Sequence, residues 1–313
     1  MVNFDHQSGL YEVDLEHSSC GVGFLTRKDG KQTHDLLELA HEALCSVPHR
    51  GGMSSEGVGD GAGVSVDLSA NFFSRITKKQ LKVGEFGVGN FFLPSDVKQQ
   101  NRAVDLIEQK LKNAGFSILL ARHLPVDEAQ IGERSIKWQL PIRQWIFVPS
   151  NPSNQRPERN FEQKIHRVLL EIESVAYVDR SLEGTYPLSL SSRLQVFKGR
   201  LNSWEIVPYF CDLQSKEHHI HTLYFHTRFS TNTDPHPTMA QPFRLMAHNG
   251  ELNTDKKNRL SETAIALARN KAIIRPKGQS DSCRFDQTLG SRIFDEGLEL
   301  VDAVVSMMPP AWE

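Results

Sequence analysis

The sequence lacks the features that would direct it to a membrane or to a polyanionic partner. It contains no stretch close to the roughly 20 apolar residues that a membrane helix requires. Lys and Arg number 36 and Asp and Glu number 38, so the net charge of the 313 residues is −2. This balance gives no electrostatic reason to expect nucleic acid or an anionic membrane as a partner.

A secretory signal is also missing, and cysteine is scarce. The first 19 residues are polar and acidic, without the apolar centre of a signal peptide, so we expect a cytoplasmic protein. The cysteines are Cys20, Cys45, Cys211 and Cys283. No two lie within four residues of each other, so no CxxC pair is available for zinc or an iron–sulfur cluster, and we expect no metal in this chain. Scattered thiols in such a chain are most often unpaired core residues.

Hydrophobic periodicity predicts runs of strands separated by helices. The pattern predicts strands at 20–25, 63–68, 85–93, 116–124, 142–149, 188–199, 222–230 and 243–252. It predicts helices at 33–47 and 99–114, another after the polar loop 150–160, and mainly helix from Lys256 onward. Strands in runs favour stacked antiparallel sheets covered by helices over a βαβ alternation, in one domain.

Cys20 opens the segment CGVGFL and is either a small apolar strand residue or a nucleophile. A cysteine thiol with a pKa of about 8.5 is mostly protonated at neutral pH and needs a base. A histidine is the usual base. Alternatively, a cysteine that is first in the mature chain can use its own α-amino group, with a pKa of about 7.7–8.0. Residues 1–19 would then be a pro-segment.

Amide hydrolysis also requires hydrogen-bond donors for the oxyanion that forms. The segment HNGEL offers the side-chain amide of Asn249 and the backbone N–H of Gly250. Asn-Gly is equally a common type I′ hairpin turn, so this pair alone leaves both interpretations open.

Two charged residues could hold an amino-acid substrate at its α-carbon. Arg228 could bind a carboxylate in a bidentate manner, and Asp281 could accept from an ammonium group. Read individually, Arg228 is a strand-edge charge and Asp281 a loop or helix-cap residue. The glycine-rich turns HRGG and DGAG are weak phosphate-binding signals, because they lack the Lys-[Ser/Thr] of a P-loop.

Together these motifs resemble a known family. In order along the chain they are GLYEVDLEHSSCGVGFL, HRGGMSSEGVGDGAG, GVGNFFLP, LSLSSRLQVFKG, HTRFSTNTDPHPTMAQPFRLMAHNGELNT, GQSDSCRFD and MMPPAWE. The order and the amino-acid sequences of these motifs resemble those of the amino-terminal glutaminase domain of the glutamate synthases, a class II glutamine amidotransferase. That domain is a member of the N-terminal nucleophile hydrolase superfamily, and the resemblance covers essentially the whole chain.

The resemblance implies an α+β fold, a four-layer αββα sandwich of two antiparallel sheets. It implies that residues 1–19 are removed and that residues 20–313 form the glutaminase domain with Cys20 as N-terminal nucleophile. Asn249 and Gly250 would form the oxyanion hole. The implied contacts of glutamine are Arg228 for the α-carboxylate, Asp281 for the α-ammonium, Phe229, Thr231 and Asn232 as pocket lining, and Arg50 of HRGG near the site.

The family also implies partners that this chain does not supply. A full glutamate synthase has an FMN-binding barrel, an iron–sulfur cluster and an ammonia tunnel, so we expect no cofactor here and an FMN-binding synthase domain or subunit as partner. The expected reaction is hydrolysis of L-glutamine to glutamate and ammonia, for glutamate synthesis from 2-oxoglutarate. Two alternatives remain open: an amidotransferase that serves another acceptor, and an unprocessed regulatory subunit that binds glutamine without turnover.

Overall fold

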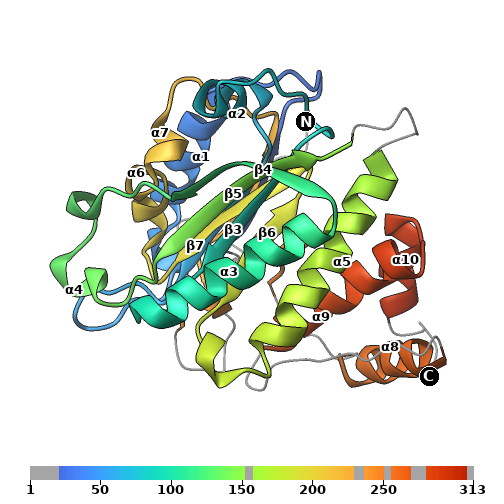
Figure 1. Cartoon of the computed structure of the whole chain (residues 1–313). Helices are drawn as coiled ribbons and strands as arrows, with labels where there is room; N and C mark the ends of the chain where they lie inside the picture. Colours follow the sequence, from blue (N-terminus) through green and yellow to red (C-terminus); the bar gives the residue numbers. More distant parts are fainter. Residues whose placement is uncertain (1–20, 152–157, 229–235, 250–254, 269–279, 309–313) are drawn as a thin grey trace, which may run out of the picture.

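Two four-stranded antiparallel sheets form the centre of the molecule. The computed structural model describes residues 21–151, 158–228, 236–249, 255–268 and 280–308 (Figure 1). The first sheet has the order β1 (Val22–Thr26), β8 (Thr222–His226), β2 (Ala62–Asp67) and β7 (Leu194–Gly199). The second has the order β4 (Phe116–His123), β5 (Ile142–Pro149), β3 (Gly87–Phe92) and β6 (Tyr186–Ser191). The predicted α+β class with two antiparallel sheets is confirmed.

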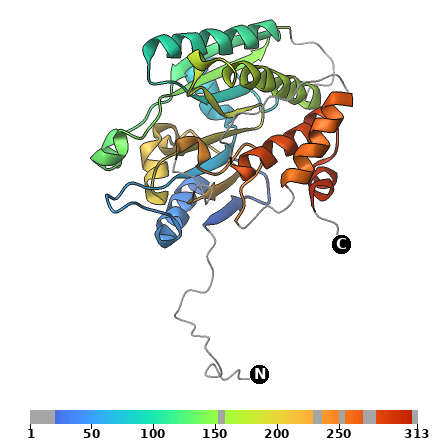
Figure 2. The same ribbon diagram turned by 90° about the horizontal axis from the view of Figure 1, so that it is seen from below.

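Helices cover the second sheet on its outer face. α3 (Val97–Asn113) and α5 (Glu158–Ala176) place apolar residues such as Ile107 and Ile165 against the fully buried Trp145 of β5. Figure 2 shows both helices together on one side of the sandwich. Both were expected from their apolar spacing, and α3 begins at Asp96, whose carboxylate accepts from Gln99 N–H at 3.0 Å.

The other helices lie elsewhere around the two sheets, and Phe72 and Phe73 of α2 (Ala70–Thr77) pack in a core with Val88 and Ile146 of the second sheet. α1 (Asp35–Ser46) buries Leu37 and Leu44 in a core shared with β2, β7 and β8. Figure 2 shows the last three helices, coloured orange to red, gathered at one end of the sandwich. The remaining helices are α4 (Glu133–Ile136), α6 (Ile206–Tyr209), α7 (Cys211–Gln214), α8 (Asp255–Ala268), α9 (Asp281–Gly290) and α10 (Leu300–Met307). Within the described ranges, no helix is long and apolar enough to cross a membrane.

The prediction of a single strand at 188–199 is wrong. This segment forms β6 and β7, which belong to different sheets and are joined at Ser192–Arg193. The carboxylate of Glu162 on α5 accepts from Ser192 N–H at 2.7 Å and from the hydroxyls of Ser191 and Ser192, both at 2.6 Å. These contacts hold the chain in a turn, and a helix that is remote in sequence supplies them.

The prediction of a strand at 243–252 is also wrong for its described part. Residues 243–249 form turns and irregular backbone, and residues 250–252 lie outside the described residues. Leu245 N–H and Met246 N–H donate to one carboxylate oxygen of Asp286 on α9, at 2.7 and 3.2 Å. Phe243 N–H donates to the carbonyl of Met246 at 2.9 Å. Backbone donors that are occupied in this way cannot join a strand ladder.

Candidate active site

The candidate site forms where β8 ends and β1 begins. Thr227 N–H donates to the carbonyl of Gly21 at 2.7 Å, immediately beyond the pair Val22–His226 in the strand register. A Cβ atom on Gly21 would overlap the hydroxyl of Thr227 and lie 3.4 Å from Cβ of Arg50. Glycine here lets the chain pass close to Thr227 and Arg50 without displacing the Thr227 side chain. Cys20, which precedes Gly21, lies outside the described residues.

The HRGG turn packs against the same strand end. Arg50 closes the short helix Pro48–Arg50, and Gly51 follows it. A Cβ atom on Gly51 would lie 3.2 Å from the carbonyl oxygen of Thr227. The structure thus brings Arg50 next to Gly21.

A buried histidine, His226, joins the backbone of Arg228 to that of His248, the residue before Asn249. Arg228 N–H donates to Nδ1 of His226 at 2.9 Å, and Nε2 of the same ring lies 3.0 Å from the carbonyl oxygen of His248. Arg228 and Asn249 are both exposed to solvent. An exposed guanidinium and an exposed amide on neighbouring segments can reach a small polar substrate.

The N-terminus of α9 reaches the same place. Ser280 caps the helix, accepting from Cys283 N–H at 3.1 Å, so that Asp281 lies in the first turn. The Asp281 carboxylate accepts from Ser282 N–H at 2.7 Å, and the Ser282 hydroxyl is 2.6 Å from Nε2 of His248. Ser282 therefore links Asp281 to His248, the residue that precedes Asn249.

Burial determines the charge state of the histidines in this region. It lowers the pKa of His226 to about 4, against a smaller opposing effect of the carbonyls of His248 and Arg228. Burial also lowers the pKa of His248, and the negative charge of Asp281 partly opposes it. Both rings are consequently neutral at pH 7 and can each donate one N–H.

A buried lysine supports the segment between Arg228 and Asn249. The Lys198 ammonium donates to the carbonyls of Thr238 and Ala240 at 3.1 and 2.8 Å, and burial lowers its pKa to about 8. The next residue, Gln241, accepts from His248 N–H at 3.1 Å through its side-chain oxygen. Lys198 thereby fixes the backbone from which the Gln241 side chain reaches His248.

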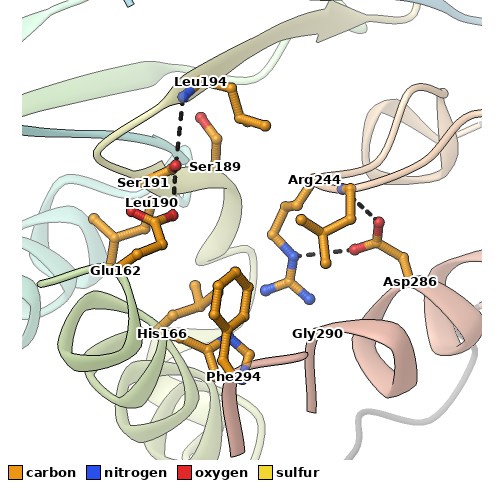
Figure 3. A pocket seen from close by; sticks show the side chains of 12 residues that line it. Glu162, His166, Ser189, Leu190, Ser191, Leu194, Arg244, Asp286, Gly290 and Phe294 are labelled. Atoms are coloured by element: carbon orange, nitrogen blue, oxygen red, sulfur yellow. Dashed lines mark hydrogen bonds and ion pairs between the residues drawn. The ribbon is translucent and has the colours of Figure 1, made fainter. Parts of the chain in front are cut away.

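A small cavity lies beside this region rather than in it. It has a volume of about 30 Å³, and its lining includes Glu162, His166, Ser191, Arg244, Asp286 and Phe294 (Figure 3). Arg244 pairs with Glu173 at 3.2 Å and with Asp286 at 3.3 Å. Burial by itself would lower the pKa of Arg244, but these two carboxylates outweigh it and the pKa is raised. Asp286, which lines the cavity, also accepts from the N–H groups of Leu245 and Met246.

Four of the nine predicted site residues lie in the described part, namely Arg50, Arg228, Asn249 and Asp281, and they gather at one end of the first sheet. The other five, Cys20, Phe229, Thr231, Asn232 and Gly250, lie outside the described residues. The supporting residues His226, Gln241 and Ser282 were not singled out from the sequence, although each stands in a quoted motif. Among the described residues, no group of three His, Cys, Asp or Glu side chains could hold a metal ion.

The stacked antiparallel sheets with flanking helices form the α+β sandwich of the N-terminal nucleophile hydrolases. The sequence profile of the family described as glutamine amidotransferases class-II matches residues 20–313. The chain belongs to the class-II glutamine amidotransferases.

Similar proteins are glutamate synthases from fungi, bacteria and plants. Glutamate synthase (NADH) of Saccharomyces cerevisiae is 33% identical over 324 residues, covering 97% of this chain and 15% of the yeast protein. Glutamate synthase (NADPH) large chain of Bacillus subtilis is 33% identical over 254 residues, covering 80% and 16%. Ferredoxin-dependent glutamate synthase, chloroplastic, of Oryza sativa is 30% identical over 321 residues, covering 97% and 20%. The chain thus spans 15–20% of these relatives, and the resemblance to the glutaminase domain of glutamate synthase is confirmed.

Proposed function

We propose that this chain hydrolyses L-glutamine to glutamate and ammonia, with Cys20 as nucleophile at the N-terminus of a mature chain that has lost residues 1–19. The observation that carries the proposal is the meeting of Arg228, Asn249 and Asp281 beside Gly21, the residue after Cys20, in a class-II glutamine amidotransferase. The family profile begins at Cys20, which further supports this residue as the start of the enzyme.

In this mechanism the thiolate of Cys20 attacks the side-chain amide carbon of glutamine. The α-amino group of Cys20 accepts the thiol proton and passes it to the leaving nitrogen, so that ammonia departs and a γ-glutamyl thioester remains. Water then attacks the thioester, the same amine takes its proton, and glutamate and the free thiol are released. In both halves the side-chain N–H of Asn249 and the backbone N–H of Gly250 donate to the oxyanion.

The substrate's charged groups have counterparts at the same sheet end. Arg228 binds the α-carboxylate and Asp281 binds the α-ammonium of glutamine, while Phe229, Thr231 and Asn232 line the pocket. Arg50 completes the site from the HRGG turn. These opposite charges select free glutamine, since a peptide-bound glutamine has neither α group ionised.

We further propose that the ammonia is used by a synthase domain that converts 2-oxoglutarate to glutamate. The similar proteins are five to seven times longer than the matched segment, as their coverage of 15–20% requires. FMN and an iron–sulfur cluster would belong to that domain. The described cysteines of this chain, Cys45, Cys211 and Cys283, lie in separate elements and offer no cluster of ligands.

The test combines intact mass with glutaminase kinetics on the purified chain. We expect an active protein that begins at Cys20, and a Cys20→Ala variant without turnover. Full turnover by a preparation that retains residues 1–19 would contradict the N-terminal mechanism, because Cys20 would then carry an amide instead of an amine. Glutamine binding without turnover in that unprocessed form would favour the regulatory alternative.

A further inference from the structure

His226 is a buried ring that lies between the two halves of the proposed site. It is the last residue of β8 and is 3% exposed. Its register partners are Val22 on β1 and Gly63 on β2. A Cβ atom on Gly63 would lie 2.9 Å from the carbonyl oxygen of Gln241, so glycine here lets the Gln241 segment approach β2 beside His226.

The polar groups around the imidazole of His226 favour one of its two neutral tautomers. Nδ1 lies 2.9 Å from Arg228 N and 2.8 Å from Arg228 O, while Nε2 lies 3.0 Å from His248 O. With the proton on Nε2, the ring donates to His248 C=O and accepts from Arg228 N–H. The carbonyl of Arg228 then takes the N–H of Gln241, 3.4 Å away. With the proton on Nδ1, both His248 C=O and Arg228 N–H would lose their partner.

The same peptide of His248 is held from a second direction. Its N–H donates to the side-chain oxygen of Gln241 at 3.1 Å, and its carbonyl accepts from His226. The imidazole of His248 is tied to Ser282 of α9 at 2.6 Å. His226 and Gln241 therefore hold the two sides of the residue that directly precedes Asn249.

We propose that His226 is a positioning residue for amide hydrolysis: as the Nε2–H tautomer it links the backbone of Arg228 to that of His248, and so sets the distance between the carboxylate-binding and oxyanion-binding sides of the site. This inference rests on the proposed function. It assigns His226 no contact with glutamine and no proton transfer in the reaction. The other charged or titratable groups facing the ring are Arg228 and His248.

The test is the effect of His226→Leu on kcat and KM for glutamine. A misplaced oxyanion donor is felt only in the transition state, so we expect kcat to fall on the order of 10²-fold while KM changes little. His226→Gln retains a side-chain N–H that can reach His248 C=O, whereas His226→Asn is too short. We therefore expect the kcat values to rank wild type, then Gln, then Asn, and this ranking decides the matter if the Leu variant does not fold.

His218→Leu is the matched control. His218 is a fully buried ring four residues before the start of β8, with Nδ1 2.8 Å from the carbonyl of Asp212 and a stacked contact with Phe72. Its loss should lower the melting temperature without a selective loss of kcat. Equal kcat losses in the Leu variants of His218 and His226, or equal kcat values for His226→Gln and His226→Asn, would overturn the inference. Absence of glutaminase activity in the wild type would instead reject the proposed function.

Discussion

A few buried side chains hold the segment before Asn249 through one or two hydrogen bonds each. The Gln241 oxygen holds His248 N–H, the Ser282 hydroxyl holds the His248 ring, and Asp286 holds the turn before them. The residues proposed to contact substrate, Arg228 and Asn249, are exposed. The residues that hold the backbone thus differ from those proposed to contact substrate. Mutations should therefore separate effects on stability from effects on turnover.

Asn249→Ala should reduce turnover and leave stability nearly unchanged. Loss of one oxyanion donor typically costs about 10²–10³ in kcat. The side chain is exposed, so its removal creates no cavity and the melting temperature should hold. Kinetics and thermal melting on the same sample check both. Asn113→Ala, at the exposed end of α3, is the control and should change neither quantity. A lower melting temperature with normal kcat would instead indicate a turn-forming role for Asn249.

Arg228→Lys should weaken use of glutamine even though the charge is retained. A guanidinium binds a carboxylate through two parallel hydrogen bonds, and an ammonium cannot reproduce that geometry. A hydrogen bond to a charged group contributes about 1.5–3 kcal/mol, so we expect kcat/KM to fall roughly 10- to 100-fold. Arg75→Lys, an exposed position on α2 paired with Glu217, is the control.

The α groups of the substrate offer the complementary test. Glutamine acetylated on its α-nitrogen, or carrying an α-amide, should be a poor substrate, since each loses the partner of Arg228 or Asp281. Steady-state kinetics with the three compounds measure this preference. Similar kcat/KM values for all three would remove both residues from the proposed site.

At the scale of elements, the proposed site lies where the ends of strands and helices come together. The end of β8, the HRGG turn after α1 and the first turn of α9 meet there, and each is held by contacts with segments remote in sequence. α9 is anchored at its start by the buried Ser280 and along its length by Asp286. The orientation of Asp281 therefore depends on how α9 begins.

Ser280→Ala should affect both stability and substrate binding. Loss of a serine cap costs about 0.5–2 kcal/mol of stability, and fraying of the first turn would displace Asp281. We expect a lower melting temperature and a raised KM for glutamine. Asp96→Ala, which removes the cap of α3, is the matched control: it should lower the melting temperature comparably and leave KM unchanged. An unchanged KM in Ser280→Ala would mean that Asp281 does not bind the substrate.

At the scale of the whole molecule, two neutral buried histidines make stability depend on pH. Burial lowers the pKa of His218 and of His226 to about 4, from an ordinary value of 6.5. Between these values the unfolded chain binds protons that the folded chain does not. Above about pH 6.5 the two histidines do not reduce the free energy of unfolding. As the pH drops from 6.5 toward 4, each histidine lowers it by about 1.4 kcal/mol per pH unit.

Denaturant titrations between pH 7.5 and pH 4.5 check this dependence. His218→Leu should be less stable at pH 7.5 but lose less stability on acidification, because one of the two groups is gone. The difference between variant and wild type isolates His218, since Glu205 and Asp212, whose pKa values burial raises, titrate in both proteins. The groups around His218 are Asp212, Asp67, His34 and Arg122. Identical slopes in the two proteins would show that His218 is not held neutral.

Local patterns in the sequence predicted most of the elements. α3 and α5 followed from apolar spacing, β1 to β5 from short apolar runs, and the helical C-terminal part from its periodicity. Each of these depends on residues within one turn or one strand, which a single sequence displays directly. The motifs around Cys20, Arg228 and Asn249 likewise indicated the family, and the profile over 20–313 confirms it.

The sequence by itself determined most of the element types, the sandwich class and the family, because periodicity and motif chemistry are local. Tertiary structure alone decided where strands end and how the site residues meet. Glu162 turns the chain between β6 and β7, Asp286 removes residues 243–249 from any strand, and His226 joins Arg228 to His248. Each of these contacts joins a backbone group to a side chain that lies elsewhere in the sequence or faces it across a strand end. A buried backbone donor takes whichever acceptor the fold brings near, and that choice exists only once the sheets have packed.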